Sequence, residues 1–361
     1  MGKYSLENFS PYPVRIARPK PLAVSPENPG RGFAQVIECS WRELEPEKGC
    51  YMLDTLQKTA EARNPVLVLN PGQPDWGKPE DGEACFARLV RRAGSALLGG
   101  RKLAGVLIPP GTDSLEIREA YLAAFDKAPL LADIREEALI RFLQARGISF
   151  GLSVPCGEET WIDRCGAFAR LSLQDTWEKA PVFVRVSDAE PGENISREVF
   201  RWHASLCDKD LDLGYCLTLR RATYPGKVSC GGAFPVRFWF VNTGSAPCYR
   251  DFTLKLRLKK EDCEEILPLS IRKENWKTGD IVHNEIVPLS ITRPGTYTVW
   301  AGAFFGDGSP LKLCIQNREE NGFYELGTVE ADLLSRPELF TAWDSFYPDG
   351  YYPLEDPKAP G

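Results

Sequence analysis

The sequence has only two histidines, His203 and His283, in 361 residues. This shortage limits both metal binding and general-base catalysis, because imidazole is the commonest metal ligand and the side chain that titrates nearest neutral pH. The eleven cysteines do not compensate, since they are scattered and even the pair Cys156 and Cys165 has no spacing typical of a zinc site. We therefore expect no metal and no other cofactor.

Long apolar runs are also missing. No stretch of roughly 18 apolar residues exists, which is the length that a membrane-spanning helix needs. The first residues carry no apolar core of a secretory signal, so the odd number of cysteines is typical of free thiols in a reducing compartment. The net charge of −6 offers no basic surface for nucleic acid. The sequence predicts a cytoplasmic protein that binds neither nucleic acid nor membrane.

Two common functional signatures are absent as well. The pattern Gly-x-Ser-x-Gly of a serine nucleophile does not occur. No glycine-rich fingerprint follows a first strand, as it does in nucleotide-binding sheets. An open doubly wound sheet is the competing architecture for the N-terminal half, and this second absence gives it no support.

Short apolar runs alternate with helical patterns between residues 30 and about 210. This alternation is typical of βα units around a parallel sheet. Seven or eight such strands suggest a barrel, although about 180 residues is short for eight βα units, which usually need roughly 200 or more. The expected strands cover 33–39, 65–69, 103–108, 129–132, 148–154, 181–186 and the region 203–207.

From about residue 213 the pattern changes to strict alternation, as in the apolar series Phe252, Leu254, Leu256 and Leu258. Such alternation predicts antiparallel sheets with one wet face. The expected fold class is therefore α/β plus all-β, with a compact TIM-like (β/α) barrel followed by an immunoglobulin-like antiparallel β-sandwich. We assign the barrel to residues 1–212, the sandwich to 213–333, and an aromatic tail that packs back on the body to 334–361.

Several motifs in fixed order resemble known families. The stretch WRELEPEKGCY at 41–51 follows NPGRGF at 28–33, and together they resemble the opening of glycoside hydrolase barrels of the large retaining clan. Later motifs are similar to a bacterial domain of unknown function that follows such barrels; they are GYCL at 214–217, YPG at 224–226, NTGSAP at 242–247 and GTY at 295–297. The resemblance implies a glycoside-hydrolase-like, carbohydrate-active protein with its ligand site at the C-terminal mouth of the barrel.

The same resemblance implies two catalytic carboxylates, one after the fourth strand and one at the end of the seventh. In retaining enzymes these carboxylates lie about 5 Å apart. Here Asp113 is the nearest acid after the fourth strand, and Arg185 stands where the nucleophile is expected. A guanidinium group cannot attack an anomeric carbon, because it stays protonated. The family carboxylates are therefore not retained, and the catalytic residues are unknown.

Candidate ligand contacts lie where the expected strands end, because function collects at that face of a barrel. Structural roles compete with this interpretation: an N-cap for the aspartate at 113, a solvated helix start for the glutamate at 158, core packing for the tryptophans and a structural hydrogen bond for the histidine. The candidates are Glu38, Trp41, Asp75, Trp76, Asp113, Glu158, Arg185 and His203.

Two functions stay open on this sequence. One is a glycosidase that acts on an oligosaccharide, and the other is a non-catalytic glycan-binding or assembly protein. Arg185 offers a planar pair of donors that matches a carboxylate. We therefore expect a carbohydrate ligand that is anionic rather than neutral.

Overall fold

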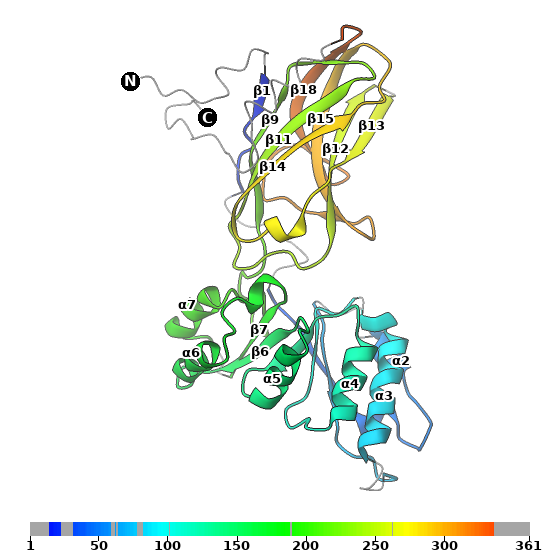
Figure 1. Cartoon of the computed structure of the whole chain (residues 1–361), viewed down its shortest axis with the longest axis vertical. Coiled ribbons are helices and arrows are strands. Elements are labelled where there is room, and N and C mark those ends of the chain that lie inside the picture. Colours follow the sequence, from blue (N-terminus) through cyan, green and yellow to red (C-terminus); the bar gives the residue numbers. More distant parts are fainter. Residues whose placement is uncertain are drawn as a thin grey trace. The chain divides into compact units, whose positions relative to one another are not determined.

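The computed structural model describes residues 14–22, 32–58, 62, 64–77, 82–100, 102–187, 190–261 and 263–335. The tail expected to pack back on the body lies almost entirely outside these residues. The chain divides into two compact units (Figure 1). One, the α/β unit, contains Pro29–Tyr215 and Ser245–Tyr249; the other, the β unit, contains Met1–Asn28, Cys216–Gly244 and Arg250–Gly361.

The α/β unit is built on one sheet of seven parallel strands that follow one another in chain order. The strands lie where the apolar runs predicted them, but the last begins only after His203 and is two residues long. They are β2 (Val36–Ser40), β3 (Val66–Asn70), β4 (Gly105–Leu107), β5 (Leu130–Asp133), β6 (Gly151–Cys156), β7 (Val182–Val186) and β8 (Leu206–Cys207).

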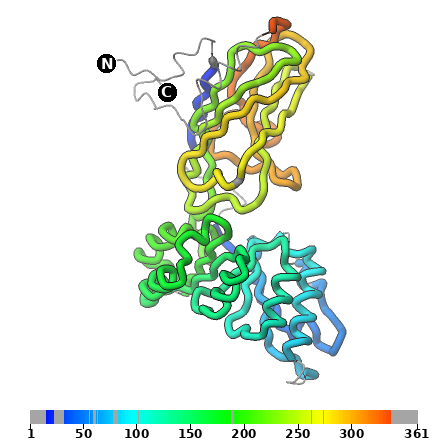
Figure 2. The backbone as a smooth tube through the Cα atoms, in the orientation of Figure 1, coloured from blue at the N-terminus to red at the C-terminus, as the bar shows by residue number. Residues whose placement is uncertain are grey.

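Helices connect most of these strands and cover one face of the sheet, the outer face. The tube in Figure 2 shows two of them, α3 and α4, running side by side. The helices are α1 (Trp41–Leu44), α2 (Asp54–Gln57), α3 (Gly82–Ala96), α4 (Leu115–Ala124), α5 (Glu137–Ala145), α6 (Trp161–Arg170) and α7 (Glu193–Arg201).

Side chains alternate between the two faces along each strand of a sheet. In β3, Leu67 and Leu69 pack under the helices on the outer face. Val66 and Val68 point to the opposite, inner face, where a smaller apolar cluster fills the space. That inner cluster consists of Ala34, Val66, Val68, Leu107, Leu131, Phe183 and Leu206.

The fold class expected from the sequence, a compact TIM-like (β/α) barrel followed by an immunoglobulin-like antiparallel β-sandwich, is wrong. The parallel sheet has seven strands, and among the described residues its end strands β2 and β8 are joined by no more than an isolated bridge between Phe33 and Cys207. The physical reason is the short chain, because eight βα units need roughly 200 residues or more. In its described residues, the connection from β2 to β3 holds the one-turn helices α1 and α2 and no longer helix, so this sheet is a half-barrel.

The β unit contains two sheets. One has the order β1 (Val14–Ala17), β9 (Leu217–Pro225), β11 (Ala233–Asn242) and β14 (Gly279–Pro288). The other has the order β10 (Lys227–Ser229), β18 (Phe323–Asp332), β15 (Gly295–Phe305), β12 (Phe252–Lys260) and β13 (Cys263–Pro268), with β16 (Pro310–Leu311) on β15 and β17 (Glu319–Glu320) on β18. Because β10 runs parallel to β18, the second sheet is not purely antiparallel. The whole chain is a strand-rich, mixed α/β protein.

Aromatic side chains join the two sheets of the β unit. The ring of Trp276 lies 5.0 Å from that of Phe240 in β11 and 5.2 Å from that of Phe252 in β12. Farther along, a Cβ atom at Gly327 would lie 2.6 Å from the hydroxyl oxygen of Tyr224, so the two sheets leave no room for a side chain there. Burial of the apolar faces of the strands therefore stabilises this unit.

All eleven cysteines are free thiols. Within the described ranges, no group of three His, Cys, Asp or Glu side chains is placed to hold a metal ion. None of the helices that the structure describes is long and apolar enough to cross a membrane.

We predict opposite effects for two helical glycines of the α/β unit. A Cβ at Gly94 would collide with the carbonyl oxygen of Ala124, where α3 and α4 pack closely. The variant Gly94→Ala should therefore lower the free energy of unfolding by about 1–3 kcal/mol, as overpacking does. The matched control Gly166→Ala, in α6, meets nothing within 4 Å and should raise it by about 0.5–1 kcal/mol.

The measurement is urea denaturation followed by the far-UV circular dichroism of the helices. Equal shifts of the two variants in the same direction would contradict the close packing of α3 against α4.

Candidate functional site

Arg185 lies near the carboxyl end of β7 and points to the inner face of the parallel sheet. It is two residues beyond Phe183, which belongs to the inner cluster, and residues two apart share a face of a strand. Its backbone neighbour in β6 is Pro155. Ligands of α/β sheets bind beyond the carboxyl ends of strands, so Arg185 is placed where such a ligand would lie.

The partner of Arg185 is Asp133, the last residue of β5, whose side chain is fully buried. Both oxygens of this carboxylate are used. Oδ1 accepts hydrogen bonds from the backbone N and Nε of Arg135 at 3.0 and 2.9 Å. Oδ2 accepts from Nη2 of Arg135 at 2.8 Å and from Nη2 of Arg185 at 3.0 Å. Four bonds fill the acceptor capacity of a carboxylate, so Asp133 has no lone pair left for a substrate.

The two arginines are less buried than the carboxylate between them. The side chain of Arg135 is 48% exposed and that of Arg185 is 26% exposed. The hydrogen bonds that Arg135 donates to Asp133 raise the pKa of Arg135, with smaller contributions from the charges of Asp133 and Glu136. Glu136 itself accepts a hydrogen bond from the backbone N of Gly111 at 3.2 Å. Both guanidinium groups are therefore held in place and permanently charged.

Two polar atoms at this edge lack partners. Within the described part of the chain, Nε of Arg185 and Oγ of Ser153 are buried without a hydrogen bond. Ser153 pairs with Asp133 in the backbone register and shares the inner face with it. A buried donor without a partner costs roughly 1–3 kcal/mol of stability. This edge of the sheet is therefore polar and incompletely satisfied, unlike the apolar inner cluster beneath it.

Glu38 also points to the inner face, because it is two residues beyond Val36, which packs against the inner cluster. It lies in β2 beside Val68 and is exposed. Glu38 and Arg185 thus share a face of the sheet, in strands near its two edges.

Trp41 and Trp76 pack together in the apolar cluster on the outer face, and not with Arg185. Their rings meet edge to face at 5.8 Å, and Trp41 also contacts Phe86 of α3. Nε1 of Trp41 donates to the carboxylate of Glu45 at 2.8 Å, and Nε1 of Trp76 donates to the backbone oxygen of Glu45 at 2.9 Å. Since both indole N–H groups are occupied, this pair has a packing role.

Three acidic candidates form local contacts. Asp75 pairs with Arg42 at 2.7 Å, and Asp113 pairs with Arg118 at 3.2 Å; both carboxylates are 86% exposed. Glu158 binds the first turn of α7, where its oxygens accept from the backbone N of Ile195 and from Nδ2 of Asn194. A carboxylate at a helix N-terminus satisfies free backbone N–H groups and matches the helix dipole.

His203 lies at the opposite end of the sheet from Arg185, because it precedes β8 while Arg185 lies near the end of β7. Its Nδ1 is 2.8 Å from the backbone oxygen of Ser245, and its ring stacks on Trp177 at 3.7 Å. The backbone φ of His203 is +51°, a conformation that non-glycine residues seldom adopt. The structure therefore does not bring His203 together with Arg185.

Sequence reasoning missed Asp133 and Arg135 as members of the site. Asp133 and Glu136 have the spacing of a capping box, a pattern that indicates the start of a helix rather than the end of a strand. In the structure Glu136 is the N-cap of α5, but its side chain makes no capping hydrogen bond to the helix, and Asp133 binds arginines instead. An acid at a strand end two residues before an arginine is the signal that could have found this pair.

The chain has no match among family models or curated proteins and only weak likenesses among solved structures. Among solved structures, a CARDB domain from Pyrococcus furiosus is 14% identical, with 32% of this chain and 93% of that chain covered and a TM-score of 0.20. A Niemann-Pick type C2 protein from Japanese carpenter ant is 7% identical, with 29% and 79% covered and a TM-score of 0.20.

A β-glucosidase from Listeria innocua in complex with glucose is 10% identical, with 88% of this chain covered and a TM-score of 0.21. This chain spans about half of that enzyme, since 48% of the enzyme is covered. The TM-scores of all these likenesses are too low to support an argument about function.

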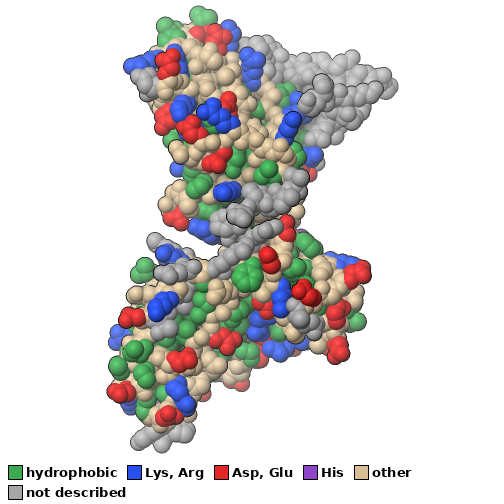
Figure 3. Space-filling model, turned by 180° about the vertical axis from the view of Figure 1, so that it is seen from behind, with side chains coloured by type: hydrophobic (Ala, Val, Ile, Leu, Met, Phe, Trp, Pro, Cys, Tyr) green, Lys and Arg blue, Asp and Glu red, His purple; other side chains and the backbone are tan. Residues whose placement is uncertain are grey.

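On the face shown in Figure 3, basic and acidic side chains lie intermingled, so the charge of a site depends on a few local residues.

We predict that Asp133→Asn lowers the free energy of unfolding by about 1–3 kcal/mol. An amide would turn a donor toward guanidinium donors and remove the counter-charge of two arginines. The control is Asp75→Asn, which breaks an exposed ion pair and should change stability by no more than about 0.5 kcal/mol. Urea denaturation compares the two variants, and faster hydrogen exchange in β5, β6 and β7 should accompany only the first. Equal effects would show that the bonds to Asp133 contribute no more than a surface pair.

Proposed function

We propose that the α/β unit binds an anionic carbohydrate at the carboxyl edge of β5, β6 and β7, and that it does not hydrolyse this ligand. The observation that carries the proposal is the arrangement around Asp133. Its carboxylate holds Arg135 and Arg185 in place, while within the described residues Arg185 is hydrogen-bonded through Nη2 alone. The remaining guanidinium N–H groups form a rigid, charged set of donors that suits a ligand carboxylate.

The carbohydrate class rests on the resemblance of the sequence to glycoside hydrolase barrels. The preference for a negative charge rests on the two arginines, because a guanidinium group offers donors and no acceptor. A neutral sugar needs acceptors as well as donors for its hydroxyl groups. These two arguments are independent, so they can be tested separately with acidic and neutral ligands.

Two features of this edge oppose retaining hydrolysis. That chemistry needs one carboxyl group to protonate the leaving oxygen and a second to attack the anomeric carbon. Arg185 occupies the position where the resemblance implies the nucleophile, and the lone pairs of Asp133 are filled by four hydrogen bonds. A fixed positive charge 4 Å from an oxocarbenium-like transition state would be repulsive by about 4 kcal/mol at an effective dielectric of 20.

We predict that a glucuronate-containing disaccharide binds more tightly than its neutral glucose analogue. Arg185→Gln should weaken binding of the acidic disaccharide by about tenfold to a hundredfold, because a charge-assisted hydrogen bond is lost, and should leave the neutral one unaffected. The control is Arg42→Gln, an exposed arginine of the same unit that pairs with Asp75. Isothermal titration calorimetry measures the affinities. Tighter binding of the neutral disaccharide, or equal losses in both variants, would refute the role of Arg185.

We also predict no turnover of aryl glycosides above the uncatalysed rate. The repulsion of about 4 kcal/mol corresponds to about three powers of ten in rate, in addition to the loss of the nucleophile. Release of nitrophenol from neutral and acidic aryl glycosides is the measurement. Turnover that is abolished by Asp113→Asn or Glu158→Gln would show instead that the protein is a glycosidase with carboxylates at new positions.

A further inference from the structure

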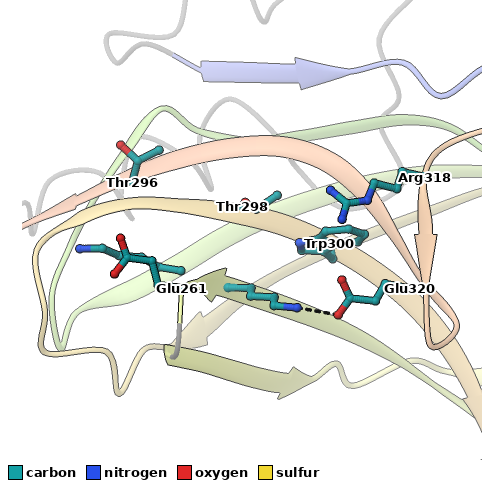
Figure 4. Close-up of a pocket in the computed structure, with 8 residues that line it drawn as sticks. Glu261, Thr296, Thr298, Trp300, Arg318 and Glu320 are labelled. Atoms are coloured by element: carbon teal, nitrogen blue, oxygen red, sulfur yellow. Dashed lines mark hydrogen bonds and ion pairs between the residues drawn. The ribbon is translucent and has the colours of Figure 1, made fainter.

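The outward face of the second sheet in the β unit carries a hollow of about 500 Å³. Figure 4 shows it over β12 and β15, with the short strand β17, which carries Glu320, at one side. Its surface is polar and charged around one indole ring. The lining consists of Lys259, Lys260, Glu261, Thr296, Thr298, Trp300, Arg318 and Glu320.

Trp300 in β15 lines this hollow, and its backbone partner in β12 is Arg257, which is not itself one of the lining residues. The guanidinium group of Arg257 lies 4.5 Å from the ring of Trp300 and 4.6 Å from that of Phe323. The side chain of Arg257 is only 4% exposed. Three of the donors here, Nε and Nη2 of Arg257 and Nε1 of Trp300, have no hydrogen-bond partner among the described residues.

Three such buried donors without partners are unusual for the surface of a sheet. A buried donor without a partner lowers stability, and several together are rare in folded proteins. An arginine that is almost fully buried also requires a negative partner. Only one protein carboxylate is close to Arg257 within the described residues, that of Glu320 at 3.3 Å.

Glu320 acts as an internal anion in this hollow. Its Oε1 accepts a hydrogen bond from Nζ of Lys259 at 2.6 Å, and that bond lowers the pKa of Glu320. Glu320 belongs to the two-residue strand β17, which is followed by a turn through Asn321 and Gly322 with positive φ angles. A side chain on so short an element can leave its place without disturbing the rest of the sheet.

The charges around the hollow have a small positive excess. Arg318 lies over the ring of Trp300 at 5.5 Å and is 72% exposed, and it also pairs with Glu325 at 3.4 Å. Lys260 donates to the backbone oxygen of Pro294 at 2.9 Å. With Arg257 and Lys259 these side chains supply four positive charges, against the three carboxylates of Glu261, Glu320 and Glu325.

We infer that this hollow binds a small ligand through a carboxylate or phosphate group, which takes the place of the Glu320 carboxylate on Arg257 and Lys259. The hydroxyl groups of Thr296 and Thr298 line the same hollow and can bind polar groups of the ligand. This site is in the other unit from Arg185, and it does not depend on the function proposed above.

The test uses the full chain with Arg185→Gln, so that the edge of the parallel sheet does not contribute. Inorganic phosphate and glucuronate are titrated separately, and the indole N–H resonance of Trp300, assigned with Trp300→Phe, reports binding in this hollow. At least one of the two anions should shift this resonance in a saturable manner. The tighter binder identifies the phosphate or the carboxylate as the recognised group, and no shift with either anion would overturn the inference.

Three further variants separate binding from structure. Lys259→Gln should weaken binding by about tenfold, because it removes a charge-assisted hydrogen bond. Glu320→Gln should tighten it by a similar factor, because it removes the competing internal anion. Lys255→Gln is the control, since Lys255 lies on the same strand and face but over the ring of Phe304, outside the lining. It should change affinity by less than about twofold. An unchanged or weaker affinity of Glu320→Gln would overturn the inference.

Discussion

The buried carboxylate of Asp133 is the constraint on which the carboxyl edge of the parallel sheet depends. A charge removed from water must be paired and hydrogen-bonded, or it neutralises. Asp133 meets this requirement through Arg135, two residues away, and Arg185, 52 residues away in the sequence and two strands away in the sheet. The strand between them, β6, presents only small side chains on this face, such as Ser153. An arginine from β7 can therefore reach β5.

Much of the secondary structure could be predicted because it has local causes. Apolar runs placed all seven parallel strands, and the alternation of Phe252, Leu254, Leu256 and Leu258 matches a buried face of β12. The closure of the sheet could not be predicted in this way. It depends on how β2 and β8 meet, and no local pattern shows that an isolated bridge between Phe33 and Cys207 links them. The parallel pairing of β10 with β18 could not be predicted from the sequence either, because it joins segments that are far apart in the chain.

The residues of the candidate site also differ in how far the sequence predicts them. Period-two alternation places Arg185 on the same face as Phe183, so its direction follows from the sequence alone. Its partner does not, because a contact between residues 52 apart leaves no trace in either local pattern. For Trp41 and Trp76 the sequence suggested a binding role that the structure does not show. Their residue types suit sugar stacking, but Glu45 binds both indole N–H groups and commits the pair to packing.

Both units place a largely buried arginine on a sheet face with donors left unpaired within the described residues, Arg185 in one and Arg257 in the other. Such donors lower stability, and a bound anion would supply the partners that they lack. The two carboxylates that face them differ in freedom. Asp133 belongs to the central strand β5 and is fully buried, so it holds its arginines in position. Glu320 lies beside a turn and is 29% exposed, so an incoming anion can replace it. In the two proposed sites, the first carboxylate would therefore orient the arginines that bind the ligand, whereas the second would be displaced by it.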